Sequence, residues 1–579
     1  MKRLACLCYR ISIKYLNTYF KHITTTMSAA TTPAGTALPT FAAHLDALAR
    51  RQPDAVALFD RDQPLSVAAL HAAVGRLAAG LAHMGVGPGS RVAVWLPNCA
   101  EWIVAFLACA HLGALVLAVN TRFRAAEVAD ILGRGRAQWL VYWPAFKGID
   151  FAAILDDVPD SALQTLRGAI ALDDAANAAP ARLRGRPVWP WRQLADGHPA
   201  VAPVAADDTG VLCFTTSGTT SLPKFVLHDQ GTLLRHGHAV AQAYGYGDDA
   251  RILAAAPFCG AFGFAMLVGA LARGVPVVCE PVYDTARTAQ AIRRHRITHA
   301  FANNEALAQL FQSGQPGDFA TLRLCGFASF APALDNLLGL ADKHGVPLTG
   351  LYGSSELIAL VAAQPLDAAQ GDVSVRYLAG GLLIYTQARV RACDPHSGAV
   401  LPHGQSGELQ IHSPSLMRGY LDNPQATADA LTADGYFKTG DLGYTIGPRQ
   451  FVFQARLGDS LRLAGFLVNP AEIERLVESL PGVRACQVVG AVHQGKAVPY
   501  AFVLLQPGAQ PDPHGWQAAC RRALAGFKVP AGFHVLPSFP SVESANSVKI
   551  QKHKLRDMAV ALLAGAPAGD QGLPGPQKR

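Results

Sequence analysis

The sequence predicts an α/β fold, in which strands and helices alternate along the chain. A strand over Arg91–Leu96, a helix over Glu101–Leu112 and a strand over Ala114–Val119 follow one another. Because strands joined by a helix pair in parallel, this order predicts a parallel sheet covered on both faces. The chain has 579 residues, half of them hydrophobic, which is enough for a large core and more than one domain.

Other segments show the residue patterns of helices and strands. Apolar residues recur at helical spacing over Ala68–Met84, and Gly85 follows as a stop. Asn469 stands before Pro470 as an N-cap, which predicts a helix from Pro470 onward. The remaining expected elements are a helix from His228 to Tyr244 and strands or strand ends at Val211–Phe214, Ile252–Ala256, Ala300–Asn304 and Leu322–Ser329.

Charge is unevenly distributed, with an excess of basic residues at the N-terminal end of the chain. The net charge is +8, and residues 1–26 hold five basic residues and no acid, so the remainder carries +3 and indicates no nucleic-acid partner. A basic leader of this kind is compatible with a transit peptide. We favour the alternative that Met27 is the true start or that the leader is a disordered extension. The Gly/Pro-rich segment 566–579 is predicted to be disordered.

Cysteine usage and hydropathy predict a cytoplasmic protein without a membrane span. The eleven Cys show no paired metal-ligand spacing, a pattern typical of reduced thiols. The longest apolar run, Ile103–Val119, is short for a membrane helix and contains His111 and Gly113. The oligomeric state cannot be predicted from these features.

The most informative stretch is Thr215–Lys224, which follows the apolar run Val211–Phe214. Six hydroxyl residues flank one Gly, and a Lys closes the segment after Pro223. Hydroxyls and main-chain N–H groups in a turn bind anions, and a Lys adds a point charge, so the expected guest is a polyphosphate. The spacing is not that of a Walker A loop. The alternative is a Ser/Thr-rich surface turn.

This stretch resembles the phosphate loop of the AMP-forming adenylating superfamily, which includes acyl-CoA synthetases, peptide-synthetase adenylation domains and luciferases. Ser221 and Phe225 stand where the family usually has Gly, which predicts a stiffer or differently shaped loop. The resemblance implies that Lys224 is catalytic. It further implies that ATP is bound by Thr215, Thr216, Ser217, Gly218, Thr219 and Thr220, with Thr219 also near the metal.

A second motif, Tyr352-Gly353-Ser354-Ser355-Glu356, is similar to the family's Tyr-Gly-x-Thr/Ser-Glu. An aromatic face suits adenine, a hydroxyl suits phosphate oxygens, and a carboxylate suits Mg²⁺. By the resemblance, Tyr352 and Gly353 bind the nucleotide, Ser355 contacts phosphate and Glu356 holds magnesium. Taken alone, the same residues could form an ordinary turn before an acid.

Two further motifs resemble the family's ribose-binding and hinge segments. Asp441, in Thr439-Gly440-Asp441, is implied to accept both ribose hydroxyls, since a charged acceptor suits a diol. The alternative is a turn residue that caps its own backbone. Arg456 is implied to contact the nucleotide and to start the hinge. Gly458 replaces the usual Asp or Lys there, which predicts a looser pivot.

The C-terminal motifs complete the set. Gly465 is implied to line the CoA tunnel. In the basic segment Ser547–Arg556, Lys549 is implied to bridge the substrate carboxylate and the α-phosphate, although Val548 replaces a usual Gly. The other interpretation of this segment is a solvated charged surface.

The acyl pocket is implied to include Phe258, Gly260 and Phe262. No acid lies between Arg251 and Val278, so a cationic substrate would be left unpaired in an apolar site. We therefore expect a carboxylic acid with an uncharged body, fatty or aromatic. Each aromatic residue here could instead be plain core. The two residues Phe327 and Phe330 could narrow either the adenine slot or the acyl tunnel.

The resemblance runs from about Leu38 to Met558. It implies a large multi-sheet α/β domain over residues 27–455 and a small mobile α+β domain over 456–565. The implied enzyme is an acyl-CoA synthetase that uses ATP, Mg²⁺ and CoA to convert a small-molecule carboxylic acid to acyl-AMP and then to a thioester. Two alternatives stay open: an acyl-AMP ligase that loads a carrier protein, and a degenerate nucleotide-binding protein without activity.

Overall fold

The computed structural model describes residues 40–173, 180–194, 197–204, 206–216, 223–328, 335–366, 375, 378–459, 461–463, 466–493, 496–524, 526–543 and 548–565. Main-chain contacts divide the chain into two compact units. The first unit comprises residues 1–389 and 412–437, and the second comprises 390–411 and 438–579. The expected division into a domain over residues 27–455 and a mobile domain over 456–565 stays a prediction.

One sheet of the first unit is largely parallel. Strands β3, β4, β5, β8 and β11 pair in parallel, which confirms the expectation drawn from the β-α-β order. Its order is β22 (Gly419–Tyr420), β12 (Phe225–Asp229), β11 (Gly210–Thr215), β4 (Leu115–Ala118), β3 (Arg91–Trp95), β5 (Trp139–Tyr142), β8 (Gly168–Ala171), β10 (Arg186–Pro190) and β9 (Arg182–Leu183).

The other large sheet of the first unit runs through the middle of the sequence. Its order within this unit is β2 (Gln63–Ser66), β1 (Val56–Asp60), β14 (Val277–Cys279), β13 (Ile252–Ala254), β15 (His299–Asn303), β16 (Leu324–Ala328), β17 (Leu348–Tyr352), β18 (Ala362–Ala363) and β19 (Gly380–Leu383). A small hairpin joins β6 (Ala145–Phe146) and β7 (Ile149–Asp150).

Helices cover these sheets. The described α-helices of the first unit are α2 (Phe41–Arg51), α3 (Val67–His83), α4 (Ala100–Leu112), α5 (Ala125–Arg134), α6 (Phe151–Asp156), α7 (Trp191–Leu194), α8 (Gln230–Ala243), α9 (Ala261–Arg273), α10 (Thr285–His295), α11 (Asn304–Ser313), α12 (Asp335–His344) and α13 (Pro424–Ala430). Across the segments that the structure describes, no helix is both long enough and apolar enough to cross a membrane.

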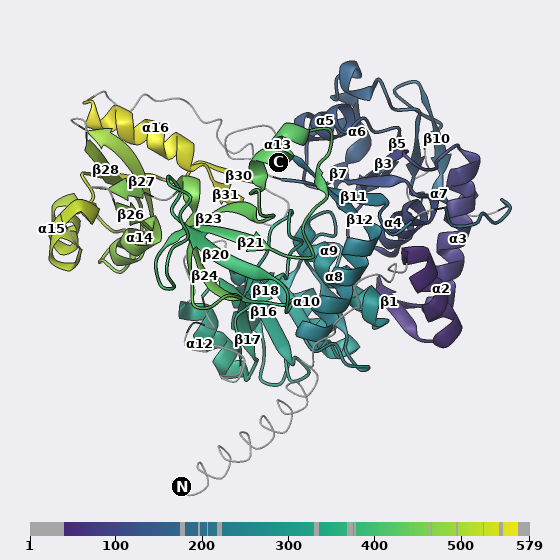
Figure 1. Ribbon diagram of the computed structural model, residues 1–579, viewed down its shortest axis with the longest axis horizontal. Coiled ribbons are helices and arrows are strands. Elements are labelled where there is room, and N and C mark those ends of the chain that lie inside the picture. The colour runs from purple at the N-terminus through teal and green to yellow at the C-terminus, as the bar shows by residue number, and fades with distance from the viewer. Residues whose placement is uncertain are drawn as a thin grey trace, which may run out of the picture. The chain divides into compact units, whose positions relative to one another are not determined.

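Helices α8 and α9 lie side by side in the first unit (Figure 1). Their close approach depends on Gly237, where a Cβ atom would collide with the main chain of Val268. Such contact between backbones requires a residue without a side chain. The packing of α8 on α9 therefore fixes where the polar side chains of α8 lie.

In the second unit, helices cover both faces of a three-stranded sheet. Apolar residues of α14 and α15 pack on one face of β27 and β28, and Leu555 and Ala559 of α16 pack on the other (Figure 1). The elements of this unit are β20 (Arg389–Cys393), β21 (Gly407–His412), β23 (Phe437–Thr445), β24 (Gln450–Arg456), β25 (Leu461–Leu463), β26 (Phe466–Val468), α14 (Pro470–Glu478), β27 (Val483–His493), β28 (Lys496–Leu505), α15 (Pro513–Ala523), β29 (Phe533–Val535), β30 (Ser541–Glu543), β31 (Val548–Ile550) and α16 (Lys552–Leu563).

Most predicted elements are confirmed at or near their predicted bounds. Helix α3 begins after Ser66, whose side chain caps it, and α4 ends at Gly113 with φ of 69°. Asn469 caps α14 as expected. The prediction that the helix starts at His228 is wrong, because residues up to Asp229 form strand β12 and Asp229 caps α8.

Candidate active site

The Tyr352–Glu356 motif begins at the end of a buried strand and continues into a tightly folded loop. Tyr352 is the last residue of β17, and residues 353–361, here called the carboxylate loop, carry Glu356. A Cβ atom at Gly353 would collide with the main chain of Ala359, so the loop closes on itself at this point. Ile358 and Leu360 have φ of 58° and 63°. Left-handed backbone at a buried β-branched residue is strained, and the surrounding contacts must hold it.

Those contacts reach the loop's main-chain carbonyls from outside the loop. His228 Nε2 lies 2.7 Å from the carbonyl oxygen of Ser355, and His236 Nε2 lies 2.8 Å from that of Ala359. Tyr244 donates its hydroxyl to the carbonyl of Leu360 over 3.1 Å. Because a buried carbonyl without a partner costs about 1–3 kcal/mol, these bonds stabilise the loop substantially.

Burial keeps both imidazoles neutral. Removal from solvent lowers the pKa of His228 to about 4, and it lowers the pKa of His236 to about 4. A carbonyl oxygen only accepts, so in each ring Nε2 carries the hydrogen. Tyr385 completes the arrangement, with its hydroxyl 3.2 Å from His236 Nδ1.

Glu356 and Lys224 meet at one aromatic side chain. Tyr420 donates its hydroxyl to Glu356 Oε1 over 2.9 Å, and Lys224 Nζ lies 4.6 Å from the centroid of the same ring. The main-chain N–H of Met417 also donates to the carbonyl of Glu356 over 2.7 Å. Strand β22, which carries Tyr420, pairs with β12 just after Lys224. The structure thus brings together two predicted site residues through Tyr420, a residue that none of the motifs described above includes.

The base of the phosphate loop is also defined. Thr216 donates its main-chain N–H to the carbonyl of Lys224 over 2.9 Å, and Lys224 returns its own N–H to Thr216 Oγ1 over 3.1 Å. Thr215 pairs with Phe225 across β11 and β12. The predicted residues Ser217, Gly218, Thr219, Thr220 and Ser221 lie outside the described residues.

Phe225, which stands where the family usually has Gly, is a strand residue with a buried ring. Its side chain is 5% exposed within the apolar core, and the Arg134 guanidinium lies 4.8 Å from its ring centroid. This position therefore uses ordinary strand backbone, and the Phe side chain packs in the apolar core.

A magnesium ion fits the donor chemistry of this site. A carboxylate has about four lone-pair sites, so the single bond from Tyr420 leaves Glu356 able to bind a cation. In the described part of the chain, no three His, Cys, Asp or Glu side chains gather as a metal site. Magnesium that accompanies a nucleotide is commonly bound by one or two carboxylates, with phosphate oxygens and water as its other ligands.

The predicted acyl-pocket residues lie at the start of α9. Gly260 is the N-cap of this helix, and Phe262 lies in its first turn. Phe258 is 1% exposed, and its ring packs 5.4 Å from that of Trp102. Phe327 is a core residue packed among α10–α12. Its expected place beside the adenine slot or the acyl tunnel stays a prediction. Phe330 lies outside the described residues.

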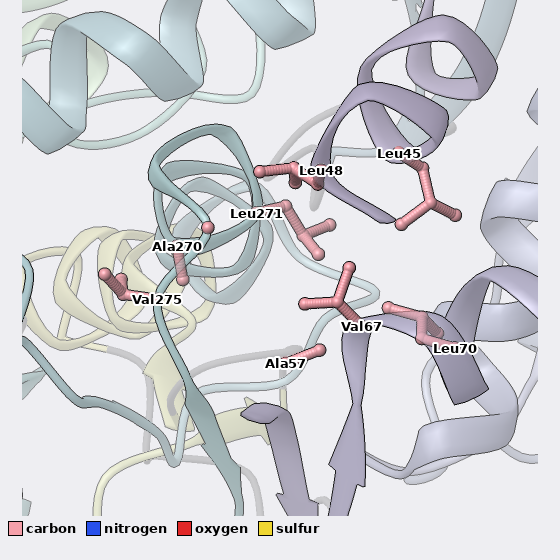
Figure 2. Close-up of a pocket in the computed structure, with 9 residues that line it drawn as sticks. Leu45, Leu48, Ala57, Val67, Leu70, Ala270, Leu271 and Val275 are labelled. Carbon is pink, nitrogen blue, oxygen red and sulfur yellow. The ribbon is translucent and has the colours of Figure 1, made fainter. Parts of the chain in front are cut away.

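A small hollow elsewhere in the first unit contains none of the predicted site residues. It encloses about 10 Å³, which is about the space of one water molecule. Apolar side chains of α2, α3 and α9 surround it (Figure 2), and its lining consists of Leu45, Leu48, Ala57, Val67, Leu70, Ala270, Leu271, Gly274 and Val275. Its size and apolar lining suit no nucleotide.

In the second unit, Asp441 and Arg456 form an ion pair of 2.8 Å between directly opposed positions of β23 and β24. The Asp441 side chain is 4% exposed and that of Arg456 is 57% exposed. Asp441 is therefore a strand residue, and the alternative of a self-capping turn residue is wrong. The main-chain N–H of Asp441 donates to Thr439 Oγ1, which fixes the main chain at this residue.

The hinge and the C-terminal motif lie in the same unit. Gly458 sits in a short 3-10 turn, Leu457–Asp459, and Arg556 donates to its carbonyl over 3.1 Å. The main chain of Lys549 pairs with Val542, and its side chain lies outside the described residues, as does Gly465. Lys552 pairs with the buried Glu474 over 3.0 Å, so this member of the basic segment has a structural role.

The two groups of site residues belong to different units. Lys224, Tyr352, Gly353, Ser355 and Glu356 lie in the first unit, and Asp441 and Arg456 lie in the second. That they share one nucleotide cleft stays a prediction.

Comparison with known proteins agrees with these motifs. Residues 45–421 match the family of AMP-binding enzymes, and residues 472–546 match the AMP-binding enzyme C-terminal domain. The chain therefore belongs to the AMP-binding enzyme family, which confirms the adenylating superfamily that its motifs indicated.

Similar curated proteins are CoA ligases. The chain is 32% identical to the 3-[(3aS,4S,7aS)-7a-methyl-1,5-dioxo-octahydro-1H-inden-4-yl]propanoyl:CoA ligase of Mycobacterium tuberculosis, over 90% of this chain and 99% of that protein. It is 29% identical to a feruloyl-CoA synthase of an Amycolatopsis species, over 86% of this chain and 96% of that protein. With this likeness over most of its length, the chain is an AMP-forming acid–thiol ligase.

A solved structure confirms the fold class of a large α/β part with a smaller C-terminal domain. The AMP complex of O-succinylbenzoate CoA synthetase from Bacillus subtilis has a TM-score of 0.73 at 25% identity, covering 90% of this chain and 99% of that one. The expected mobility of the small domain stays a prediction.

Proposed function

We propose that this ligase activates a carboxylic acid with an uncharged body, fatty or aromatic, and transfers the acyl group to CoA. The observation that carries the proposal is the arrangement around Tyr420, where a carboxylate and an ammonium group from distant segments lie about one ring. A carboxylate that can hold a metal ion and an ammonium group that can bind phosphate together suit a metal-bound polyphosphate.

In the first step, the substrate carboxylate attacks the α-phosphorus of ATP, and pyrophosphate leaves. The transition state concentrates negative charge on phosphoryl oxygens, so the protein acts mainly by positioning and electrostatic stabilisation. Lys224 and the hydroxyls of Thr215–Thr220 bind phosphate oxygens. Glu356 and Thr219 would hold Mg²⁺, which neutralises phosphate charge. Lys549 bridges the carboxylate and the α-phosphate.

The nucleoside is bound by both groups of residues. Tyr352 stacks on adenine beside Gly353, and Ser355 contacts phosphate. Asp441 accepts the ribose hydroxyls, and Arg456 changes partner from this carboxylate to the nucleotide. The pairing of Asp441 with Arg456 supports this assignment, because it places a cation beside a buried carboxylate whose oxygens accept hydrogen bonds.

In the second step, the thiol of CoA attacks the acyl carbonyl and releases AMP. Gly465 lines the tunnel for the pantetheine arm, and the domain over 456–565 rotates between the steps, so that one cleft serves both reactions.

The segment that carries the predicted acyl pocket disfavours an acid with a cationic body. No acidic residue lies between Arg251 and Val278, and the side chain of Phe258 is buried among aromatic rings. The two relatives named above act on acids whose names describe a bicyclic diketone and a phenylpropanoid. Both acids have uncharged bodies, which supports an acid of this class for the present chain.

A pyrophosphate-release screen over carboxylic acids tests the proposal. With Mg²⁺, ATP and CoA, one class of uncharged-body acid should give AMP and an acyl-CoA product. Lys549→Ala should reduce acyl-adenylate formation by at least about a hundredfold, since it removes a group that acts in the transition state.

Lys554→Ala is the matched control, because Lys554 is an exposed lysine in the same basic segment. It should retain wild-type rates. If no acid in a broad panel released AMP, or if an acyl carrier protein replaced CoA as the acceptor, the proposed function would be wrong.

A further inference from the structure

The carboxylate loop is held by side chains that none of the predicted motifs includes. His228, at the end of β12, and His236, in α8, each place Nε2 within 2.8 Å of a loop carbonyl. Tyr244, the C-cap of α8, reaches the next carbonyl with its hydroxyl. These three residues are here called the clamp. They engage the carbonyls of Ser355, Ala359 and Leu360, which flank Glu356 on both sides.

The loop needs such support, because its own backbone is unfavourable. Ile358 and Leu360 both adopt left-handed φ, and residues 357–361 are buried. Strained backbone of this kind persists only where its surroundings determine it. The clamp supplies bonds to carbonyls that no regular strand or helix satisfies in this part of the loop.

We propose that the clamp positions the Glu356 carboxylate for the magnesium ion that accompanies ATP, with His236 as its central member. His236 is fully buried, and its two ring nitrogens have different partners, Ala359 and Tyr385. The neighbouring Gly237 seats α8 against α9, so the imidazole has a fixed location. Because both ring nitrogens bond to protein groups, His236 acts through the loop and is a positioning residue.

The inference rests on the proposed role of Glu356 and predicts a specific defect. Loosening residues 357–361 lets the carboxylate move relative to Lys224 and the phosphate loop. Binding of metal-free ATP uses mainly the loop base and Lys224, which His236 does not contact. Loss of the clamp should therefore weaken Mg²⁺-dependent ATP binding far more than metal-free ATP binding.

Calorimetric titration with ATP, in Mg²⁺ and in EDTA, tests this inference without relying on turnover. Wild type should bind ATP more tightly with Mg²⁺. His236→Ala should reduce this Mg²⁺ enhancement about tenfold, the size of effect seen when partners of metal ligands are removed. His236→Gln, whose amide can still donate to a carbonyl, should recover part of it.

His344→Ala is the matched control. His344 also places Nε2 on a main-chain carbonyl of the first unit, that of Phe311 at 2.8 Å, but it lies outside the clamp. This variant should lose thermal stability and keep the Mg²⁺ enhancement. If His236→Ala does not fold, Tyr244→Phe removes one clamp bond while keeping the ring and should show the same selective loss.

Each outcome decides the matter. A folded His236→Ala protein with the wild-type Mg²⁺ enhancement overturns the inference, as does a wild type whose ATP binding ignores Mg²⁺. If the expected pattern appears in a protein that forms no acyl-adenylate, the clamp stands and the proposed function falls. If the protein forms acyl-adenylate but the clamp variants keep the wild-type Mg²⁺ enhancement, the proposed function stands and the clamp inference is wrong.

Discussion

Tyr420 donates its hydroxyl to Glu356 Oε1 over 2.9 Å while its ring lies under the ammonium group of Lys224. One side chain therefore orients the carboxylate that is proposed to hold the metal and lies against the cation that is proposed to bind phosphate. Phenol-to-carboxylate bonds are charge-assisted and fix the orientation of the acceptor.

Replacing Tyr420 separates these two effects. Tyr420→Phe keeps the ring under Lys224 and removes the bond to Glu356, so we expect kcat/KM for Mg·ATP to fall about tenfold or more. Tyr420→Leu removes both contacts and should lower kcat/KM for Mg·ATP further. Steady-state pyrophosphate release at saturating acid measures both. Equal activities for Tyr420→Phe and wild type would show that the hydroxyl does not orient Glu356.

Asp441 gives a prediction about the sugar. If its carboxylate accepts the ribose hydroxyls, Asp441→Asn should raise KM for ATP roughly ten- to a hundredfold, because it weakens charged hydrogen bonds. The same variant should lose most of the wild-type preference for ATP over 2′-deoxy-ATP. KM for the carboxylic acid should stay unchanged, and it serves as the internal control. An undiminished preference for the 2′-hydroxyl would place the ribose elsewhere.

The sequence indicated candidate site residues but not the side chains that support them. Lys224 and Glu356 stand in motifs whose residue types match their proposed chemistry. Tyr420 lies 64 residues beyond Glu356, and only the pairing of β22 with β12 brings it there. No local periodicity records such a pairing.

The same limit explains the missed clamp and the error at His228. Apolar spacing identified α8, but it could not show that His236 points into the protein toward a loop more than a hundred residues away. Phe225 was expected to make the phosphate loop stiffer or differently shaped, because it stands where the family usually has Gly. The structure makes it a buried strand residue, since pairing with β11 begins immediately after Lys224.

Buried histidines give a prediction about pH. Burial lowers the pKa of His236 to about 4 and that of His299 to about 4, against an ordinary value near 6.5. Between pH 4 and pH 6.5 the unfolded chain therefore binds more protons than the folded chain. Stability that is present above pH 6.5 is lost as the pH falls toward 4. Each histidine should cost about 2 kcal/mol of unfolding free energy between pH 7.5 and pH 5.

Urea unfolding of the wild type and of His299→Gln at the two pH values measures this loss. The variant should be less stable than wild type at pH 7.5 but should lose less stability on acidification. His396, which lies on an exposed turn, provides the control through His396→Gln, whose pH dependence should match wild type. An unchanged pH dependence in His299→Gln would show that this imidazole is not held neutral in the folded state.

The hinge gives the last prediction. Gly458 has space for a side chain, because no described atom beyond its two chain neighbours lies within 4 Å of a Cβ built there, and its backbone does not require glycine. Gly458→Asp should therefore fold with wild-type stability. A side chain at the pivot restricts its backbone, so we expect the rates of the two half-reactions to change unequally.

Arg556 donates to the Gly458 carbonyl, and Arg556→Ala should shift the ratio of these two rates by releasing that carbonyl. Single-turnover assays of adenylate formation and of its consumption by CoA measure the two rates separately, with thermal unfolding as the control. Unchanged rates for both half-reactions in both variants would exclude Gly458 as the pivot.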